Sequence, residues 1–273
     1  MTRGWSRSGL YLILIVLALF YLMPIYILLV SGMKPYEDVS IAQMWDLPRS
    51  LYIGSFVQAW GKVAPNFWNS VQIAIPAALI SSFIGSMNGY IFAKWRFRYS
   101  NVLFLVVLFG IFLPYQGVLI PLVVTLQRFH LYGSIPGLIF VHCIFGIPIT
   151  ALIFRSYFIG IPSELLDAAK IDGTGFFGIY RFIMFPIAMP AFAVALLWQF
   201  TSIWNDYLLG VVVLSNPSLS PVTVAVTNLA GSYFVQWNVQ MAGALIAAFP
   251  TIAVYLLLGR LFMRGLLAGS LKG

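Results

Sequence analysis

The stretch GLYLILIVLALFYLMPIYILLVS, residues 9–31, contains no charged side chain. A helix of this length is about 35 Å long, which is enough to cross a hydrocarbon core of about 30 Å. The run is longer than the apolar region of a signal peptide, and no clear small-x-small cleavage site follows it. It therefore predicts a membrane-spanning helix that is retained.

The composition of the whole chain agrees with this prediction. Of its 273 residues, 61% are hydrophobic and 8% are charged, whereas a soluble domain carries about 25% charged residues. A soluble globular protein is excluded, and 23 Phe, 14 Tyr and 8 Trp also exclude a disordered chain. One cysteine and two histidines cannot build a disulfide framework and are too few for a zinc centre.

Five more apolar runs are long enough to span a bilayer, at residues 67–93, 101–125, 135–157, 185–208 and 239–262. Prolines inside them are tolerated where neighbouring helices or water satisfy the freed carbonyls. We expect an all-α membrane protein with a single transmembrane domain, 1–273, of six transmembrane helices. The predicted extracytoplasmic loops are 34–66 and 210–238, and the predicted cytoplasmic loop is 159–184.

The basic residues predict that both termini are cytoplasmic. Loops on the cytoplasmic side of a membrane carry an excess of Lys and Arg. With the N-terminus inside, the inner side holds 11 of the 15 basic residues: Arg3, Arg7, Lys94, Arg96, Arg98, Arg155, Lys170, Arg181, Arg260, Arg264 and Lys272.

The inner loop between the fourth and fifth spans continues into the fifth span as IGIPSELLDAAKIDGTGFFGIYRFIMFPIAMP, residues 159–190. Pro162 suits the first turn of a helix, and Gly173 is a natural C-terminal stop. A helix of about ten residues would be marginal alone in water, so we expect a partner surface to hold it. Glu164, Asp167 and Asp172 make this helix acidic, and Ala168 and Ala169 allow close approach.

The spacing of this loop resembles the EAA loop of permeases in binding-protein-dependent ABC importers. Asp167-Ala168-Ala169 is followed by Gly173, Ile183 and Phe185-Pro186 at the family's spacing, with Asp in place of the usual Glu and Phe in place of Leu. Ile171-Asp172-Gly173 and Trp204-Asn205-Asp206 resemble elements of carbohydrate permeases. The tail, residues 264–273, resembles the end of the second permease subunit of maltose-type importers. Asn69-Ser70 and the segment 90–94 also agree with this resemblance, which covers essentially the whole chain.

The resemblance implies a function for the chain. It would be a transmembrane subunit of an ATP-driven importer of an oligosaccharide, disaccharide or glycosylated polyol, integral to a bacterial plasma membrane. Its partners would be a homologous second permease, two cytoplasmic ATPase subunits and an extracytoplasmic solute-binding protein. The sequence has no GxxxxGK[ST] loop of its own, so ATP and Mg²⁺ would be held by the ATPase subunits, and we expect neither a catalytic residue nor a cofactor in this chain.

The same resemblance assigns residues to these contacts. Glu164, Asp167, Ala168, Ala169, Asp172 and Gly173 would couple to the ATPase. Gly269 and Lys272 in the tail would also reach it. Asn228, Gly231 and Tyr233 in the loop 210–238 would contact the binding protein.

Polar residues inside the spans are candidates for the translocation path. They are Asn69, Gln116, His142, Asn205 and Asp206. Hydrogen bonding between helices is the alternative role for each of them. Two alternative functions also stay open, an ATP-independent channel or secondary transporter, and an ABC permease for a solute other than a sugar.

Overall fold

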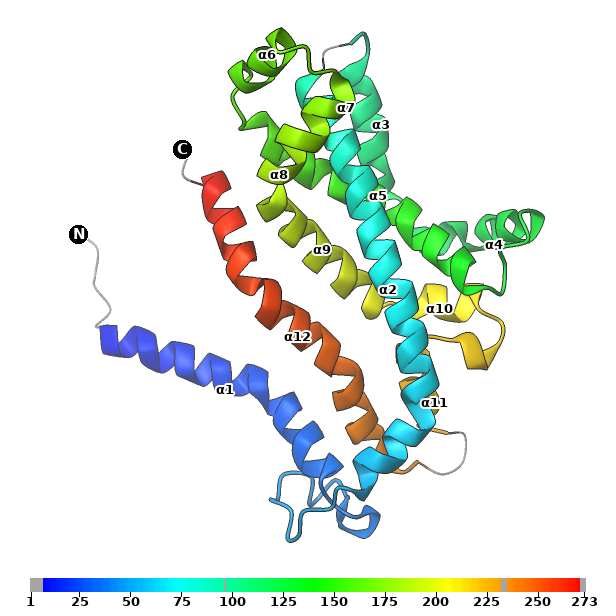
Figure 1. Ribbon diagram of the computed structural model, residues 1–273. Coiled ribbons are helices and arrows are strands. Elements are labelled where there is room, and N and C mark those ends of the chain that lie inside the picture. Colours follow the sequence, from blue (N-terminus) through cyan, green and yellow to red (C-terminus); the bar gives the residue numbers. More distant parts are fainter. Residues whose placement is uncertain (1–6, 96, 232–234, 271–273) are drawn as a thin grey trace. The chain divides into compact units, whose positions relative to one another are not determined.

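The structure is a computed structural model that describes residues 7–95, 97–231 and 235–270, with only the backbone described for residue 8 and residues 260–270. The regular elements of this described part are all helical (Figure 1). They are α1 Arg7–Gly32, η1 Tyr36–Asp38, α2 Gly54–Lys94, α3 Ser100–Phe112, η2 Tyr115–Val118, α4 Leu119–Arg128, α5 Ile135–Ile159, α6 Glu164–Ile171, α7 Phe176–Ile179, the π-helical turn η3 Tyr180–Met184, α8 Phe185–Ile187, α9 Met189–Trp204, α10 Leu208–Val213, η4 Pro217–Leu219, α11 Val222–Asn228 and α12 Trp237–Ser270.

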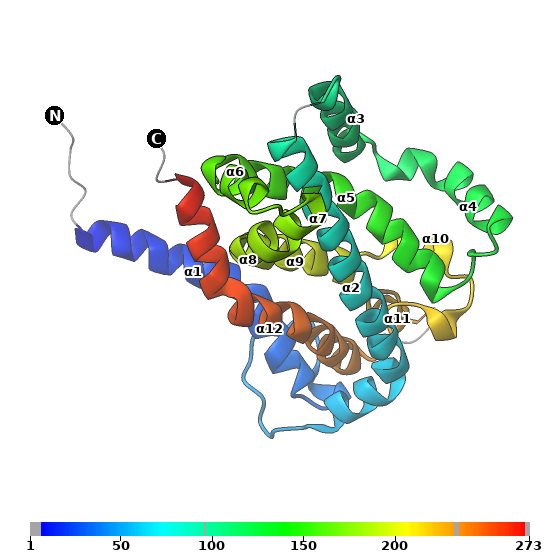
Figure 2. The ribbon, with the colours of Figure 1, turned by 45° about the horizontal axis from the view of Figure 1, so that its top comes forward.

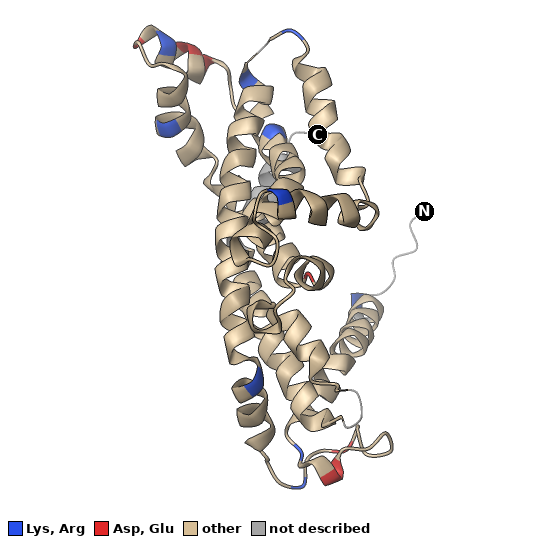
Figure 3. Cartoon of the chain, turned by 90° about the vertical axis from the view of Figure 1, so that its right-hand side faces the viewer, with Lys and Arg blue, Asp and Glu red and all other residues tan. Residues whose placement is uncertain are grey.

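The prediction of an all-helical membrane protein is confirmed. Four of the described helices are long and apolar enough to cross a membrane, and the number rises to six if each of two bent helix pairs forms one span. Most charged residues lie in loops or near helix ends (Figure 3). The orientation of the spans remains a prediction.

The predicted span 101–125 is not one straight helix. α3 ends at Phe112, and the helix from Tyr115 to Arg128 leaves at 90° to it. The reason is Pro114, which has no N–H to continue the helix and forces the preceding residue into an extended conformation. Leu113 accordingly has φ −71° and ψ 115°.

The predicted span 185–208 is also bent. Its helix begins earlier, at Phe176, and turns by 76° between Ile187 and Met189. Pro190 lies just after the bend, where its missing N–H and its ring prevent the hydrogen bonding of a straight helix. The helix α9 then ends at Trp204.

Both predicted outer loops contain more helix than expected. α2 begins at Gly54 rather than at residue 67, so the second half of the loop 34–66 is helical. The loop 210–238 contains most of α10, together with η4 and α11, and Val213, Val222 and Val224 within it are buried. Residues 210–228 are therefore largely helical rather than an open loop.

The chain divides into two compact units. The first takes the chain up to Ala64 together with Ala225–Phe249, and the second takes Pro65–Val224 together with the chain from Pro250 onward. In the first unit, the buried Lys34 donates from Nζ to the Gln43 carbonyl at 2.7 Å. The carbonyl of Lys34 accepts hydrogen bonds from Ser55 Oγ and Asn238 Nδ2, both at 3.3 Å, so this residue fastens the segment between α1 and α2 to α2 and α12.

In the second unit, α5 packs against both α3 and α9, and it lies beside α2 in both ribbon views (Figures 1 and 2). α2 and α5 approach closely at two glycines one helical turn apart. A Cβ added at Gly85 would lie 2.1 Å from Thr150 Oγ1, and one added at Gly89 would lie 2.6 Å from Phe154 Cβ. Small residues spaced in this way let transmembrane helices pack backbone to backbone.

Substitution of Gly89 by alanine tests this close approach. The added methyl group would also meet the Arg155 amide nitrogen at 2.7 Å, and overpacking of this kind costs about 1–3 kcal/mol. We expect Gly89→Ala to lower the unfolding temperature of the purified protein in detergent, measured by scanning fluorimetry.

Gly61 is the matched control on the same helix. No described atom lies within 4 Å of a Cβ built there, and alanine favours helix over glycine by up to about 1 kcal/mol. Gly61→Ala should leave the unfolding temperature unchanged or raise it. Equal destabilisation by the two variants would contradict the packing argument.

Candidate functional site

The short helix expected before Gly173 is present as α6, and its C-terminal end is fixed by backbone hydrogen bonds. Gly173 N–H donates to the Lys170 carbonyl at 3.0 Å, and Thr174 N–H donates to the Ala169 carbonyl at 2.9 Å. These two bonds form a Schellman motif, which requires a left-handed residue after the helix. Gly173 has φ +79° and supplies it.

α6 presents one apolar face to its own chain and a mixed face to the outside. Leu166 and Ala169 are buried. Among the predicted coupling residues, Glu164, Asp167, Ala168 and Asp172 are exposed. The sequence pattern treated the two alanines alike, but only Ala168 lies on the exposed surface, because Ala169 packs inward.

The exposed carboxylate of Asp167 is paired within α6. Lys170 Nζ lies 3.0 Å from Asp167 Oδ1, with both side chains at least half exposed. Lys170 also lies over the Trp95 ring, 5.7 Å from its centroid. An exposed ion pair at this helical spacing contributes only about 0.2–0.5 kcal/mol, so both groups remain available to a charged partner.

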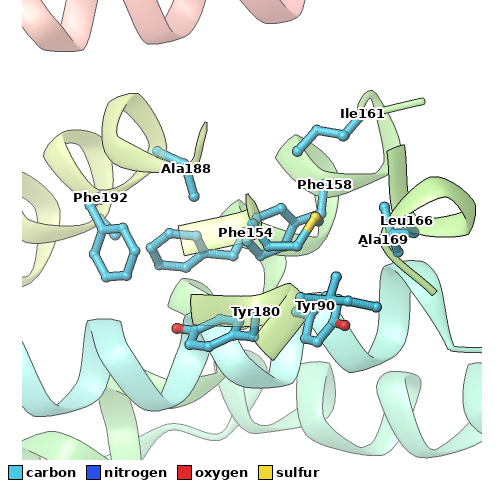
Figure 4. Packing of buried hydrophobic residues seen from close by; sticks show 13 residues of the cluster. Tyr90, Phe154, Phe158, Ile161, Leu166, Ala169, Tyr180, Ala188 and Phe192 are labelled. Carbon is cyan, nitrogen blue, oxygen red and sulfur yellow. The ribbon is translucent and has the colours of Figure 1, made fainter. Parts of the chain in front are cut away.

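Beneath α6 lies an aromatic cluster that joins it to the membrane helices. Leu166 and Ala169 pack into one buried cluster with residues of α2, α5, η3 and α9 (Figure 4). In it the rings of Phe154 and Phe192 are 4.5 Å apart, and those of Tyr90 and Tyr180 are 5.6 Å apart, measured between centroids. Side chains packed at interior density transmit displacement rather than absorb it.

Hydrogen bonds fix the cluster at its edges. The Tyr180 hydroxyl bonds the Ser86 hydroxyl, which ties η3 to α2. The Tyr157 hydroxyl donates to the Ile187 carbonyl at 2.9 Å, next to the bend between α8 and α9. Lys94 Nζ donates to the Ile161 carbonyl and so ties the end of α2 to the segment before α6.

The second feature is a cavity of about 420 Å³ in the second unit. It is lined by the helices α3, α5, α9 and α10 and by two interruptions of helical structure. Its lining includes Leu113 and Tyr115 at the break after α3, His142 and Gly146 on α5, and Gln199, Asn205 and Asp206 at the end of α9. Non-helical backbone at membrane depth is tolerated only where it is buried in protein or lines a water-filled cavity. Here both interruptions line the same cavity.

Three of the five predicted path residues line this cavity, namely His142, Asn205 and Asp206. His142 is buried. Asn205 Nδ2 donates to the Thr201 carbonyl at 2.8 Å. Asp206 Oδ1 accepts from the Leu209 N–H at 2.8 Å, so its carboxylate also holds the first turn of α10.

The other two predicted path residues lie elsewhere. Asn69 is buried, and its Nδ2 donates to the carbonyls of Ser218 and Ser220 at 2.8 and 3.2 Å. Together with Asn66, which also bonds the Ser220 carbonyl, it fastens the segment between α10 and α11 to α2. Gln116 is exposed in η2. Asn69 thus makes hydrogen bonds of the kind expected for its alternative role and does not line this cavity.

The residues predicted to contact partners are only partly described. Asn228 ends α11 and is exposed, and Gly231 follows with φ +60°. Gly269 lies in α12, where only the backbone is described. Tyr233 and Lys272 lie outside the described residues.

Sequence reasoning overlooked the glycine pair of α2. Gly85-Ser86-Met87-Asn88-Gly89 is a GxxxG pattern within an apolar run, which is a recognised signal for close packing of transmembrane helices. Gln199 is a further polar residue of the fifth apolar run, and its buried side chain lines the cavity.

Comparison with known proteins identifies the class. Residues 81–266 match the family described as binding-protein-dependent transport system inner membrane component. A probable ABC transporter permease protein of Pyrococcus horikoshii is 41% identical over 269 residues, with 98% of each chain covered. The glucose import system permease protein GlcU of Saccharolobus solfataricus is 32% identical over 272 residues, with 96% of this chain and 95% of that protein covered.

A solved structure has the same fold. A chain of a bacterial ABC transporter involved in the import of the acidic polysaccharide alginate superposes with a TM-score of 0.80 at 20% identity, with 96% of this chain and 100% of that chain covered. The fold is thus that of an ABC importer permease. The chain belongs to the family of inner membrane components of binding-protein-dependent transport systems.

The hydrogen bond from Leu209 to Asp206 generates a prediction about stability. A side chain that accepts a hydrogen bond from the first turn of a helix contributes about 0.5–2 kcal/mol. Asp206→Ala should lower the unfolding temperature of the purified protein, whereas Asp206→Asn should keep it, because an amide oxygen accepts the same bond. If the alanine variant unfolds at the temperature of the original protein, the carboxylate does not hold α10.

Proposed function

We propose that this chain forms half of the translocation path of an ATP-driven importer of an oligosaccharide, disaccharide or glycosylated polyol. In this proposal α6 is the coupling helix on which the ATPase subunits act. The chain would lie in the plasma membrane, with α6 and both termini on the cytoplasmic side, as the distribution of basic residues predicts.

The single observation that carries the proposal is the two-sided packing of α6. Its exposed face offers three carboxylates, from Glu164, Asp167 and Asp172, beside Ile171, whose side chain is 86% exposed. A large apolar side chain so exposed beside charged groups is typical of an interaction surface. The opposite face is anchored in the aromatic cluster, so a force applied to α6 has a packed route into the spans.

The helix α9 connects the aromatic cluster beneath α6 to the cavity. α9 contributes Phe192 to the aromatic cluster and, two turns later, Gln199 to the cavity wall. A rigid helix that contacts both places moves the cavity wall whenever the cluster moves. Closure of the ATPase subunits would thus tilt α9 and change access to the cavity, which is the requirement for alternating access.

The partners follow from the family and from this geometry. A second permease would close the cavity on the side where Trp198, Ser202 and Asn205 are exposed and leave these residues facing the path, because exposed polar groups at membrane depth face a protein or a water-filled path. Two ATPase subunits would hold ATP and Mg²⁺. A solute-binding protein would deliver the substrate on the outer side, near Asn228 and Gly231.

A sugar is the favoured solute because the family relatives include a glucose import permease and because the sequence carries elements similar to carbohydrate permeases. Membership of a binding-protein-dependent family argues against an ATP-independent channel or secondary transporter. An ABC permease for another solute remains the second candidate.

The experiment is purification of the chain with its partners from the native membrane, followed by reconstitution. We expect to recover a second permease, an ATPase and a solute-binding protein, and to measure ATP-dependent uptake of a sugar from a panel of glucose, arabinose, xylose and maltotriose. Recovery of the chain alone with transport that needs no ATP would contradict the proposal. ATP-dependent uptake of amino acids but no sugar would establish the second candidate.

Gly173→Val tests the end of α6. A β-branched residue resists φ +79°, so the Schellman motif should be lost. Because no described atom lies within 4 Å of a Cβ at this position, packing is not disturbed directly. We expect normal membrane insertion and a several-fold fall in ATP-driven uptake.

Gly175→Val is the matched control, because Gly175 has the same open surroundings and an extended backbone with φ −78°. It should retain uptake. Full uptake by a normally inserted Gly173→Val variant would show that the shape of this turn is not needed for coupling.

A further inference from the structure

The cavity wall carries two buried polar side chains, Gln199 and His142, and the amide nitrogen of Gln199 has no protein partner among the described residues. Gln199 is 3% exposed, and its Nε2 has no acceptor. His142 is 7% exposed and lines the same cavity. A buried donor left unpaired is costly, so the Gln199 amide is a place where a ligand or water would be stabilised, and the His142 imidazole offers a further polar group on the same wall.

Gln199 sits where only a glycine leaves room for it. A Cβ added at Gly146 would lie 2.1 Å from Gln199 Nε2, so the absence of a side chain on α5 creates the space that the amide occupies. The last torsion of a glutamine side chain is soft. A half-turn about this torsion exchanges the amide nitrogen and oxygen, so either atom can face the recess while the other faces away from it.

The rest of the wall has the chemistry of a sugar site. Trp198 is 56% exposed and lines the cavity, and the rings of Tyr115 and Phe145 lie 6.0 Å apart on the wall. Aromatic faces together with a few polar groups are typical of ligand pockets, and a volume of about 420 Å³ is within their usual range.

The charge of the wall limits the ligand class. Among the described residues that line the cavity, no Lys or Arg is present, and Asp206 supplies a carboxyl group. A uronate would bring its own carboxylate beside Asp206 without a cation to pair with, which is unfavourable in a low-dielectric site. A neutral hydroxylated ring has no such cost.

We infer that this chain itself holds a transient subsite for one neutral sugar ring, in which Gln199 and His142 bond ring hydroxyls and Trp198 supplies an aromatic face. The inference rests on the proposed function and deepens it, because it assigns to this chain a specificity determinant for the transported sugar. Gln199 is the determinant that can be tested with the least disturbance of the fold.

The test uses the complete importer in proteoliposomes and counts sugar molecules accumulated per ATP hydrolysed. The probe is whichever of glucose, arabinose, xylose and maltotriose is taken up fastest. Gln199→Leu should lower this ratio about three- to tenfold, the effect of losing one hydrogen bond, while ATP hydrolysis stimulated by the loaded binding protein persists. Its unfolding temperature should stay equal or rise, because the substitution removes an unpaired buried donor.

Ser82→Ala is the matched control. Ser82 Oγ is likewise buried and unpaired among the described residues, but Ser82 does not line the cavity. This variant should keep the original ratio of sugar to ATP. An unchanged ratio in Gln199→Leu, or an equal fall in both variants, would overturn the inference while leaving ATP-driven sugar import intact; absence of uptake by the original importer would instead refute the proposed function.

A second measurement needs no variant of Gln199. Saturation-transfer NMR on the permease–ATPase complex in nanodiscs, without the binding protein, should show contact with glucose and little contact with glucuronate. Asp206→Asn, which keeps the hydrogen bond to Leu209, should raise the glucuronate signal. Equal signals for glucose and glucuronate in the original complex would overturn the assignment of a neutral ligand.

Discussion

The close approach of α2 and α5 is the contact on which the rest of the second unit depends. Gly85 and Gly89 remove the side chains that would separate the two backbones. Thr150 Oγ1 can then donate to the Ser81 carbonyl at 3.0 Å, and Phe154 reaches the same cluster as Tyr90. Without a hydrophobic driving force between helices in lipid, such packing and hydrogen bonding are what hold a bundle together.

Two functional regions are built on that contact. The aromatic cluster at one end supports α6, and the cavity is bordered by the unwound segments after α3 and α9. α9 belongs to both regions, since Phe192 packs in the cluster and Gln199 lines the cavity. A mechanical connection between a peripheral helix and a polar cavity therefore needs no element beyond one rigid helix.

The sequence predicted the features that depend on neighbouring residues better than those that depend on contacts between residues far apart in the chain. The short helix could be placed because Pro162 and Gly173 act on their own neighbours, and the prediction of an all-helical membrane fold follows from composition. Pro114 lies inside a predicted span, in which no break is predicted. A proline shortly before Gln116-Gly117 favours a turn, which is what the structure has. The hydrogen bonds of Asn69 join it to residues about 150 positions later in the chain. A contact over such a separation cannot be predicted from the residues around Asn69.

The most direct test of the connection between α6 and the cavity is the accessibility of a single cysteine at position 202. Ser202 is exposed and lines the cavity, and the native Cys143 is buried and can be replaced by serine. In the reconstituted importer, an impermeant maleimide added from outside should label Ser202→Cys faster when ATP is bound than when it is absent. The same labelling rate in both states, in an importer that hydrolyses ATP, would contradict the account.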